Sequence, residues 1–421
     1  MKKYALFAAA ALVALAACSK NEVKPQTPET PVDDDSPVAV QFGVASPVSS
    51  VVTKSYGPLD GWNEQESLYI YSFAREAGAI DYSTATPFIN NVAATAPATG
   101  TTALSVTNPA HHGEPFYYAD NDIYDFYGYF VDEAWASGTN IEDYNKVDGP
   151  VPPITNDPTR IYVPFVIDGT QDLMIAKADP QTDLNNAKDE PGYNQDLDDP
   201  NTENYVYSAY TARRGVQPTL TFEHQLARFN FVIKSKSESA NKLKVTGIKV
   251  KSKFRGELTV VANSDDSRGI TAISDATIDF ELKQITDGKT TDLTPVSVEN
   301  YTGTETAPQS VGCGIMVIPG EASYDLVIEL AYDEDEYSPD QLPNTPINPI
   351  ESTIDASTIS GRGEGNTTET FLKGEQYTIT VYIIGPQEVE ISAELDDWTD
   401  GGNVEIDPDD KPELPSAGQG N

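Results

Sequence analysis

Apolar and polar residues alternate along most of this chain. In runs such as SLYIYSF and QYTITVYII, the aromatic and β-branched residues fall at every second position. A period of two is typical of half-buried antiparallel strands, whereas no long stretch carries the 3.6-residue apolar stripe of a helix. The runs with the strand pattern are residues 67–73, 125–131, 160–167, 219–235, 242–252, 257–262, 276–283, 314–320, 323–332, 375–384 and 388–398.

This pattern predicts an all-β fold made of antiparallel β-sandwiches. The 30 prolines and 29 glycines suit the long connections of a sandwich. Residues 178–204 are too polar for a core, and the strands become more regular after the turn-rich residues 212–218. We therefore expect an N-terminal β-sandwich domain over residues 37–215 and a C-terminal one over residues 216–400. Short helical turns are expected near residues 196–210.

The N-terminus has the pattern of an export signal. MKK is followed by the apolar run YALFAAAALVALAA, whose last three residues form the sequence LAAC with Cys18. Small residues before a cleavage site indicate a signal peptide, here residues 1–17, and the run is too short for a transmembrane helix. A cysteine directly after the cleavage site predicts a bacterial lipoprotein in which Cys18 carries acyl chains such as palmitate.

Both ends of the mature chain are polar. Residues 18–36 are rich in proline and charge and show no apolar periodicity, which predicts a disordered tether. Residues 401–421 form a polar tail after the last predicted strand. After lipidation only Cys313 is a free cysteine, so no disulfide within one chain is expected, and we predict Cys313 to be a small buried side chain.

Composition narrows the function classes. The formal net charge is −39, from 27 basic and 66 acidic residues. Such a charge repels phosphate backbones and argues against nucleic-acid binding. The three histidines, His111, His112 and His224, have neither a metal-ligand spacing nor a partner nucleophile motif, and no phosphate-binding loop occurs. We expect no enzyme activity, no metal and no cofactor.

An aromatic segment, FYYADNDIYDFYGYF at residues 116–130, has two interpretations. Its alternation predicts two strands of a hairpin whose rings fill a core. The alternative is an exposed platform for glycans, in which Tyr124 and Tyr127 would stack on sugars.

Several segments in a fixed order resemble the fimbrillin family, the subunits and anchors of type V pili in Bacteroidales-type bacteria. After the lipoprotein signal and tether come WNEQESLYIY, DFYGYFVD, DGTQDLMIAK, LTFEHQLARFNFVIKS, IMVIPG, LKGEQYTITVYI and a terminal DDW. The resemblance covers nearly the whole chain. It implies two transthyretin-like β-sandwich domains, export as a lipoprotein, and assembly of subunits head to tail.

The resemblance also implies a processing step and a donor strand. The discarded first strand would be residues 38–44, and a trypsin-like protease would cut between Lys54 and Ser55. A neighbouring subunit would then fill the opened groove with residues 388–398. The donor side chains would be Val389, Ile391, Ala393 and Leu395, which share one face at a period of two. The same segment is equally well interpreted as the last core strand of its own domain.

We therefore expect a structural pilus subunit of the cell outer membrane and fimbrium that acts in adhesion. Its partners would be other fimbrillin subunits, the outer membrane through the N-terminal lipid before processing, and a receptor on a host or bacterial surface. Two alternatives stay open. One is an uncut, lipid-anchored pilus anchor or tip protein of the same family, and the other is a surface glycan-binding lipoprotein.

Overall fold

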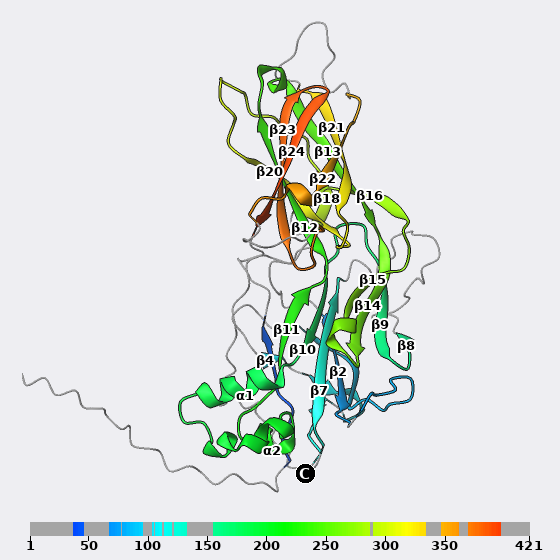
Figure 1. Cartoon of the computed structure of the whole chain (residues 1–421), viewed down its shortest axis with the longest axis vertical. Helices are drawn as coiled ribbons and strands as arrows, with labels where there is room; N and C mark the ends of the chain where they lie inside the picture. The colour runs from blue at the N-terminus through cyan, green and yellow to red at the C-terminus, as the bar shows by residue number, and fades with distance from the viewer. Residues whose placement is uncertain are drawn as a thin grey trace, which may run out of the picture.

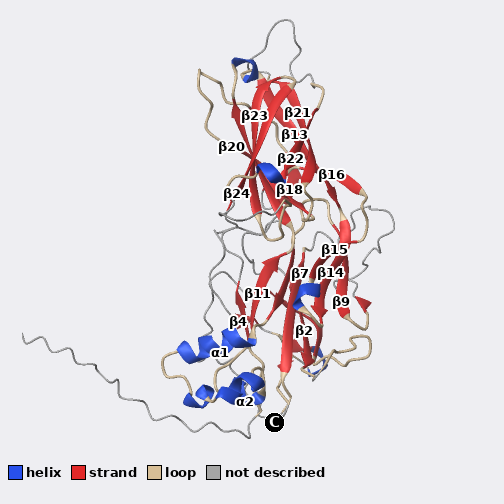
Figure 2. Cartoon of the chain, in the orientation of Figure 1, coloured by secondary structure: helices blue, strands red, loops and turns tan. Residues whose placement is uncertain are grey.

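The structure is a computed structural model (Figures 1 and 2). It describes residues 37–45, 67–76, 78–95, 103–104, 106–111, 113–119, 122–132, 155–286, 289–333, 347–361 and 369–396. The described part is mostly strands, and all eleven predicted strand segments contain one, so the all-β prediction is confirmed. The segment predicted at residues 219–235 divides into two strands, which belong to different sheets.

Two sheets lie in the lower half of Figure 1. The larger has seven strands in the order β3-β2-β7-β10-β11-β1-β4, and the smaller has the order β15-β14-β9-β8. The strands of the larger sheet are β1 (Phe42–Ala45), β2 (Ser67–Ala74), β3 (Ile89–Thr95), β4 (Ala103–Leu104), β7 (Tyr124–Val131), β10 (Leu173–Lys177) and β11 (Thr219–His224). Those of the smaller are β8 (Thr155–Asn156), β9 (Arg160–Val166), β14 (Arg255–Ala262) and β15 (Gly269–Ala272).

Two further sheets lie in the upper half of Figure 1. One has the order β20-β12-β23-β24, and the other has the order β16-β13-β21-β22 with β19 beside β13. Their strands are β12 (Ala227–Ser235), β13 (Leu243–Lys253), β16 (Thr277–Glu281), β19 (Val296–Ser297), β20 (Gln309–Val317), β21 (Ser323–Tyr332), β22 (Ile350–Asp355), β23 (Gln376–Gly385) and β24 (Glu388–Asp396).

The remaining elements are short. Two small hairpins pair β5 (Thr107–Asn108) with β6 (Glu114–Pro115) and β17 (Lys283–Thr286) with β18 (Lys289–Asp292). The helices are α1 (Pro180–Asp189) and α2 (Ala209–Ala212), and the 3-10 turns are η1 (Pro109–His111), η3 (Gln195–Asp198), η4 (Pro200–Tyr205), η5 (Glu238–Ala240), η6 (Asp265–Ser267) and η8 (Ala356–Thr358). No described helix has the length and apolar character needed to cross a membrane.

The alternation in the sequence builds the cores. Along β23, every second side chain is buried, which places Tyr377, Ile379, Val381 and Ile383 on one inward face. A large apolar cluster contains this face and extends through both halves of the molecule. A second cluster fills the space between the seven-stranded sheet and a small helical lobe, residues 179–216, which contains α1, η3, η4 and α2.

Strand pairing crosses the predicted boundary near residue 215. β11, which begins at Thr219, pairs with β10 and with β1 in the first sheet. β14 pairs with β9, although β9 lies about a hundred residues earlier in the chain. The division predicted between residues 37–215 and 216–400 therefore does not coincide with the division between the sheets. The polar stretch at residues 178–204 is part of a helical insertion between the paired strands β10 and β11.

Three local expectations need correction. The aromatic segment at residues 116–130 is not a hairpin, because β7 pairs with β2 and β10 in the middle of a sheet. The polar stretch at residues 178–204 contains α1, which the apolar pattern did not indicate, in addition to the expected helical turns. Cys313 is only half-buried, because it lies on the edge strand β20 between two glycines.

Candidate functional site

The first described strand fills a slot in the seven-stranded sheet. β1 lies between β11 and β4. It runs parallel to β11, with Gly43 opposite Thr219, and antiparallel to the two-residue strand β4. Two parallel strands need a long connection, because the chain must return to the same end of the sheet before the second strand begins. β1 is thus joined to its neighbours through distant sequence, and only hydrogen bonds and packing hold it there.

The side chains of this segment are buried at alternate positions. Val40, Phe42 and Val44 are each at most 5% exposed and belong to the second apolar cluster. The ring of Phe42 meets that of Phe126 from β7 edge to face, with centroids 5.3 Å apart. Residues 38–45, which contain β1, therefore form a plug that completes the core of this sheet.

The residues before β1 are also held by backbone hydrogen bonds. The Val40 N–H donates to the carbonyl of Phe116 at 2.7 Å, and the Tyr118 N–H donates to the carbonyl of Val38 at 3.1 Å. The Gln41 N–H donates to the side-chain oxygen of Gln217 at 3.2 Å. Loss of residues 38–45 would therefore free backbone groups on three separate segments of the body, at residues 116–118, on β4 and at residues 218–221 around the start of β11.

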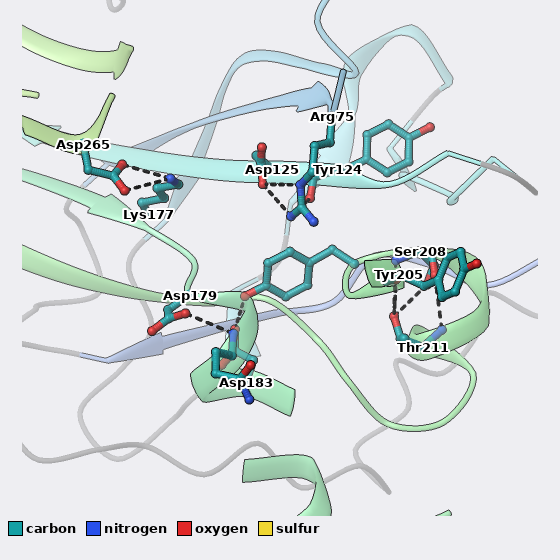
Figure 3. Close-up of polar contacts among 12 residues, drawn as sticks. Arg75, Tyr124, Asp125, Lys177, Asp179, Asp183, Tyr205, Ser208, Thr211 and Asp265 are labelled. Carbon is teal, nitrogen blue, oxygen red and sulfur yellow. Dashed lines mark hydrogen bonds and ion pairs between the residues drawn. The ribbon is translucent and has the colours of Figure 1, made fainter. Parts of the chain in front are cut away.

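The helical lobe supplies a buried carboxylate next to β11. Asp179 is the N-cap of α1 and accepts from the Gln181 N–H, and Pro180 follows it in the first turn. This start places Asp183 one turn later, pointing into the protein, with only 5% of its surface exposed (Figure 3).

Asp183 joins three parts of the lobe and sheet. Its Oδ2 accepts from the Tyr207 hydroxyl at 2.5 Å and from the Thr219 N–H of β11 at 2.8 Å. Burial raises the pKa of Asp183 to about 6, and the hydrogen bonds from Tyr207 and Thr219 oppose that rise. Burial also raises the pKa of Tyr207, so its hydroxyl keeps its proton and stays a donor.

Two ion pairs lie on other strands of the same sheet (Figure 3). Arg75, directly after β2, contacts Asp125 of β7 at 2.6 Å. Lys177, at the end of β10, contacts Asp265 of η6 at 2.9 Å. Both pairs are partly exposed to solvent, so they contribute little to stability. Arg75 is also a poor protease site, because it adjoins a buried strand.

The predicted donor residues lie on the last described strand. β24 is at the end of its sheet and pairs only with β23 in the sheet order. Val389, Ile391, Ala393 and Leu395 face the large core, and the residues between them are exposed. Near the end of β24, Ser360 covers the outer edge, because its N–H donates to Ala393 and its carbonyl accepts from Leu395. The slot of β1 and the strand β24 are thus in different sheets.

The predicted lipid and processing sites lie outside the described residues. These are Cys18, Lys54 and Ser55. The structure ends one described range at Ala45 and begins the next at Ser67, so the Lys54–Ser55 bond falls in the connection between β1 and β2. The cut and the lipid stay predictions.

Two of the three histidines, His111 and His224, lie in the described residues. His224 of β11 is buried beside Asp172, with its Nδ1 2.8 Å from a carboxylate oxygen. Across the described ranges, no group of three or more acidic, histidine or cysteine side chains is placed to hold a metal ion. His111 ends η1, and His112 falls in a gap between described residues.

The aromatic segment contributes to the core. Tyr124 and Tyr127 are at most 4% exposed, and burial raises the pKa of Tyr124 to about 12. Only Tyr117 of this segment is an exposed large ring. The core interpretation is therefore confirmed, and the exposed platform proposed around Tyr124 and Tyr127 is wrong.

Sequence reasoning missed the contact of Asp183 with Tyr207 and Thr219. The available signal was local: an aspartate before a proline marks a helix start, and Asp183, Leu184 and Ala187 then lie on one helical face. The partners are 24 and 36 residues away, so only the fold reveals that they meet.

Comparisons with known proteins give one family. The sequence matches a family model described as fimbrillin-like over residues 53–398. A search of curated proteins found no match. Among solved structures, a Bacteroides uniformis protein assigned to cell adhesion is similar at 15% identity and a TM-score of 0.43, over 87% of this chain and 99% of that chain.

Two Porphyromonas gingivalis proteins are also similar in structure. The fimbrial anchor protein Mfa2 has 10% identity and a TM-score of 0.30, over 87% of this chain and 100% of that chain. The tip fimbrial protein Mfa3, with a C-terminal truncation, has 11% identity and a TM-score of 0.32, over 86% and 100%.

Proposed function

Because this chain belongs to the fimbrillin-like family, we propose that it is a non-enzymatic structural subunit of a cell-surface type V pilus, acting in adhesion. It is exported to the outer membrane as a lipoprotein anchored at Cys18. Cleavage between Lys54 and Ser55 then releases the first strand, and a strand from another subunit replaces it. The observation that carries this proposal is β1 itself, a short plug whose apolar side chains fill a slot in the sheet.

The loss of β1 leaves an open slot in the sheet, which can bind another strand. It exposes the backbone edge of β11 and the cavity left by Val40, Phe42 and Val44. Unpaired backbone groups and exposed apolar surface both carry a free-energy cost, so the opened slot favours a new strand. Before cleavage, the attached β1 competes at a high effective concentration and prevents premature assembly.

The matching donor is the strand β24 of a second subunit. It presents Val389, Ile391, Ala393 and Leu395 at the same two-residue spacing as Val40, Phe42 and Val44. β24 is an edge strand with β23 as its sheet neighbour, so its release breaks one ladder and the two backbone hydrogen bonds with Ser360. A contact between different surfaces of identical subunits propagates head to tail and produces a filament.

An uncut, lipid-anchored anchor or tip protein is the second candidate. The observation that favours it is that neither the acceptor slot nor the donor strand is free in the single chain. β1 fills the slot, and β24 pairs along its length with β23. The function of a surface glycan binder is not supported, since the rings of Tyr124 and Tyr127 are buried.

Substitution of Lys54 tests the proposed function. Cells that carry Lys54→Ala are expected to export the protein and display it without polymer, which is read as the loss of ladders resistant to mild SDS. The matched control is Lys24→Ala, a lysine in the predicted tether. Unchanged ladders in Lys54→Ala cells would contradict cleavage at this site.

A further inference from the structure

The first residues of β11 have different neighbours on their two sides. On one side, Gly43 of β1 lies opposite Thr219, and the Gly43 N–H donates to the Pro218 carbonyl at 3.0 Å. In a parallel pair, a residue bonds to the two positions that flank its register partner, so β1 does not use the Thr219 N–H. On the other side, the ladder between β10 and β11 begins only at Phe222, opposite Ala176.

Asp183 takes the place of the missing strand on that side. The Thr219 N–H donates to its carboxylate at 2.8 Å, and the Thr219 side chain also hydrogen-bonds to it. Tyr207 donates to the same oxygen and fixes its direction. The neighbouring Leu184 anchors α1 in the apolar cluster that also holds Phe42.

Once β1 has left, residues 219–221 would have no strand on either side. A free strand end of this kind frays, and a frayed edge presents no fixed register to an incoming strand. We propose that Asp183 is a positioning residue for strand exchange: it clamps the start of β11 to the helical lobe and keeps the acceptor edge ordered while the slot is empty. This inference rests on the proposed function, because it requires that β1 is replaced.

Several ionisable groups face the Asp183 carboxylate. Asp179 caps the start of α1, and Tyr207 donates from the segment after η4. Burial raises the pKa of the Tyr118 hydroxyl, and the nearby Asp183 charge raises it further. Protonation of Asp183 removes the free-energy cost of its buried charge. When the clamp opens, the carboxyl reaches solvent and releases this proton more readily. The closed clamp therefore holds its proton more tightly than the open one, so acid favours the closed state.

The test uses the full mature chain with a specific protease site placed at Lys54–Ser55, so that the cut does not depend on the natural protease. After cutting, a fluorescent peptide of residues 38–45 is added, and anisotropy follows its uptake and release. Hydrogen exchange of the amides of residues 219–221 is measured on the uncut chain. The variants are Asp183→Ala, Asp183→Asn and Tyr207→Phe, and the matched control is Asp189→Ala, an exposed carboxylate on the same helix.

The wild-type chain is expected to take up the peptide. Asp183→Ala should bind it about tenfold more weakly and exchange the amides of residues 219–221 about tenfold faster, because the Thr219 N–H loses its acceptor. Tyr207→Phe should move both values in the same direction, and it keeps the ring if the alanine variant fails to fold. Asp183→Asn and Asp189→Ala should stay within about twofold of wild type at neutral pH.

The pH profile separates positioning from general stabilisation. Wild type should release the peptide more slowly at acid than at neutral pH, whereas Asp183→Asn should lose this dependence. Unchanged peptide affinity and unchanged exchange in Asp183→Ala, with uptake by wild type intact, would overturn the role of Asp183 and leave the proposed function standing. Failure of the wild-type chain to take up the peptide would contradict both.

Discussion

The ring of Phe42 in β1 meets the ring of Phe126 in β7 edge to face, with centroids 5.3 Å apart and planes at 85°. Phe126 is fully buried and also contacts Tyr207 of the helical lobe edge to face. One side chain of the plug is therefore in direct contact with β7, an interior strand of the sheet, and through it with the lobe that carries Asp183. Packing and hydrogen bonds, rather than chain connectivity, hold β1 in place.

Removal of the Phe42 ring tests this packing. Phe42→Ala should lower the free energy of unfolding by roughly 3–5 kcal/mol, the usual cost of deleting a buried aromatic ring. Chemical denaturation measures the loss. Gln41→Ala is the matched control, since the Gln41 side chain is half-exposed and its backbone N–H bond stays. Equal effects of the two substitutions would mean that β1 does not contribute to the core.

A charge on the inward face of β24 should block donation. Ile391→Asp is expected to reduce ladder formation at least tenfold, because an ionised carboxylate cannot enter an apolar slot without a partner. Ser392→Asp, on the exposed face of the same strand, should assemble like wild type. Circular dichroism of the two purified variants checks that both are folded. Normal ladders from Ile391→Asp would exclude β24 as the donor.

The close approach of β7 to β11 requires a glycine. A Cβ on Gly128 would lie 2.8 Å from the Cζ of Phe222, which is nearer than Cβ atoms normally come to another atom. Gly128→Ala should therefore destabilise the protein by roughly 1–3 kcal/mol through overpacking. Gly78→Ala, where a Cβ meets no atom within 4 Å, should change stability by no more than about 0.5 kcal/mol in thermal unfolding.

The Asp183 carboxyl predicts a pH dependence of stability. Burial raises its pKa to about 6, and in the unfolded chain it titrates near about 4. The folded state thus binds the proton more tightly, so this contribution to stability is fully present below about pH 4 and is lost as the pH rises through about 6. The Asp183→Asn variant lacks this titration.

Unfolding free energies of wild type and Asp183→Asn should therefore diverge with pH. Between about pH 4 and pH 7, the difference is expected to move in favour of the asparagine variant by roughly 2 kcal/mol. The comparison cancels the other carboxylates, such as Asp179, whose pKa is lowered mainly by its hydrogen bond with Thr182. A difference that stays constant with pH would show that Asp183 does not titrate in this range.

The sequence predicted the strands well and their partners poorly. The period of two located β2, β7, β13, β21, β23 and β24, because a strand with one buried face has apolar residues at alternate positions. Strand order produces no such local pattern, so the sequence did not reveal that β14 pairs with β9 or that β1 lies beside β11. The predicted boundary failed to separate the sheets for the same reason.

The candidate site shows the same limit. The apolar run at residues 38–44 and the face of Val389, Ile391, Ala393 and Leu395 could be predicted from alternation. The Asp183 clamp could not, since a buried carboxylate in a polar stretch resembles any solvated acidic residue until Tyr207 and Thr219 are placed beside it.

N-terminal sequencing of polymer shed from the cell surface tests the central claim most directly. The account predicts that the subunits begin at Ser55, carry no lipid, and lack the plug residues 38–45. Mass spectrometry of the same material should give a chain without residues 1–54. Polymer whose subunits retain acylated Cys18 and the intact plug would contradict replacement of the first strand.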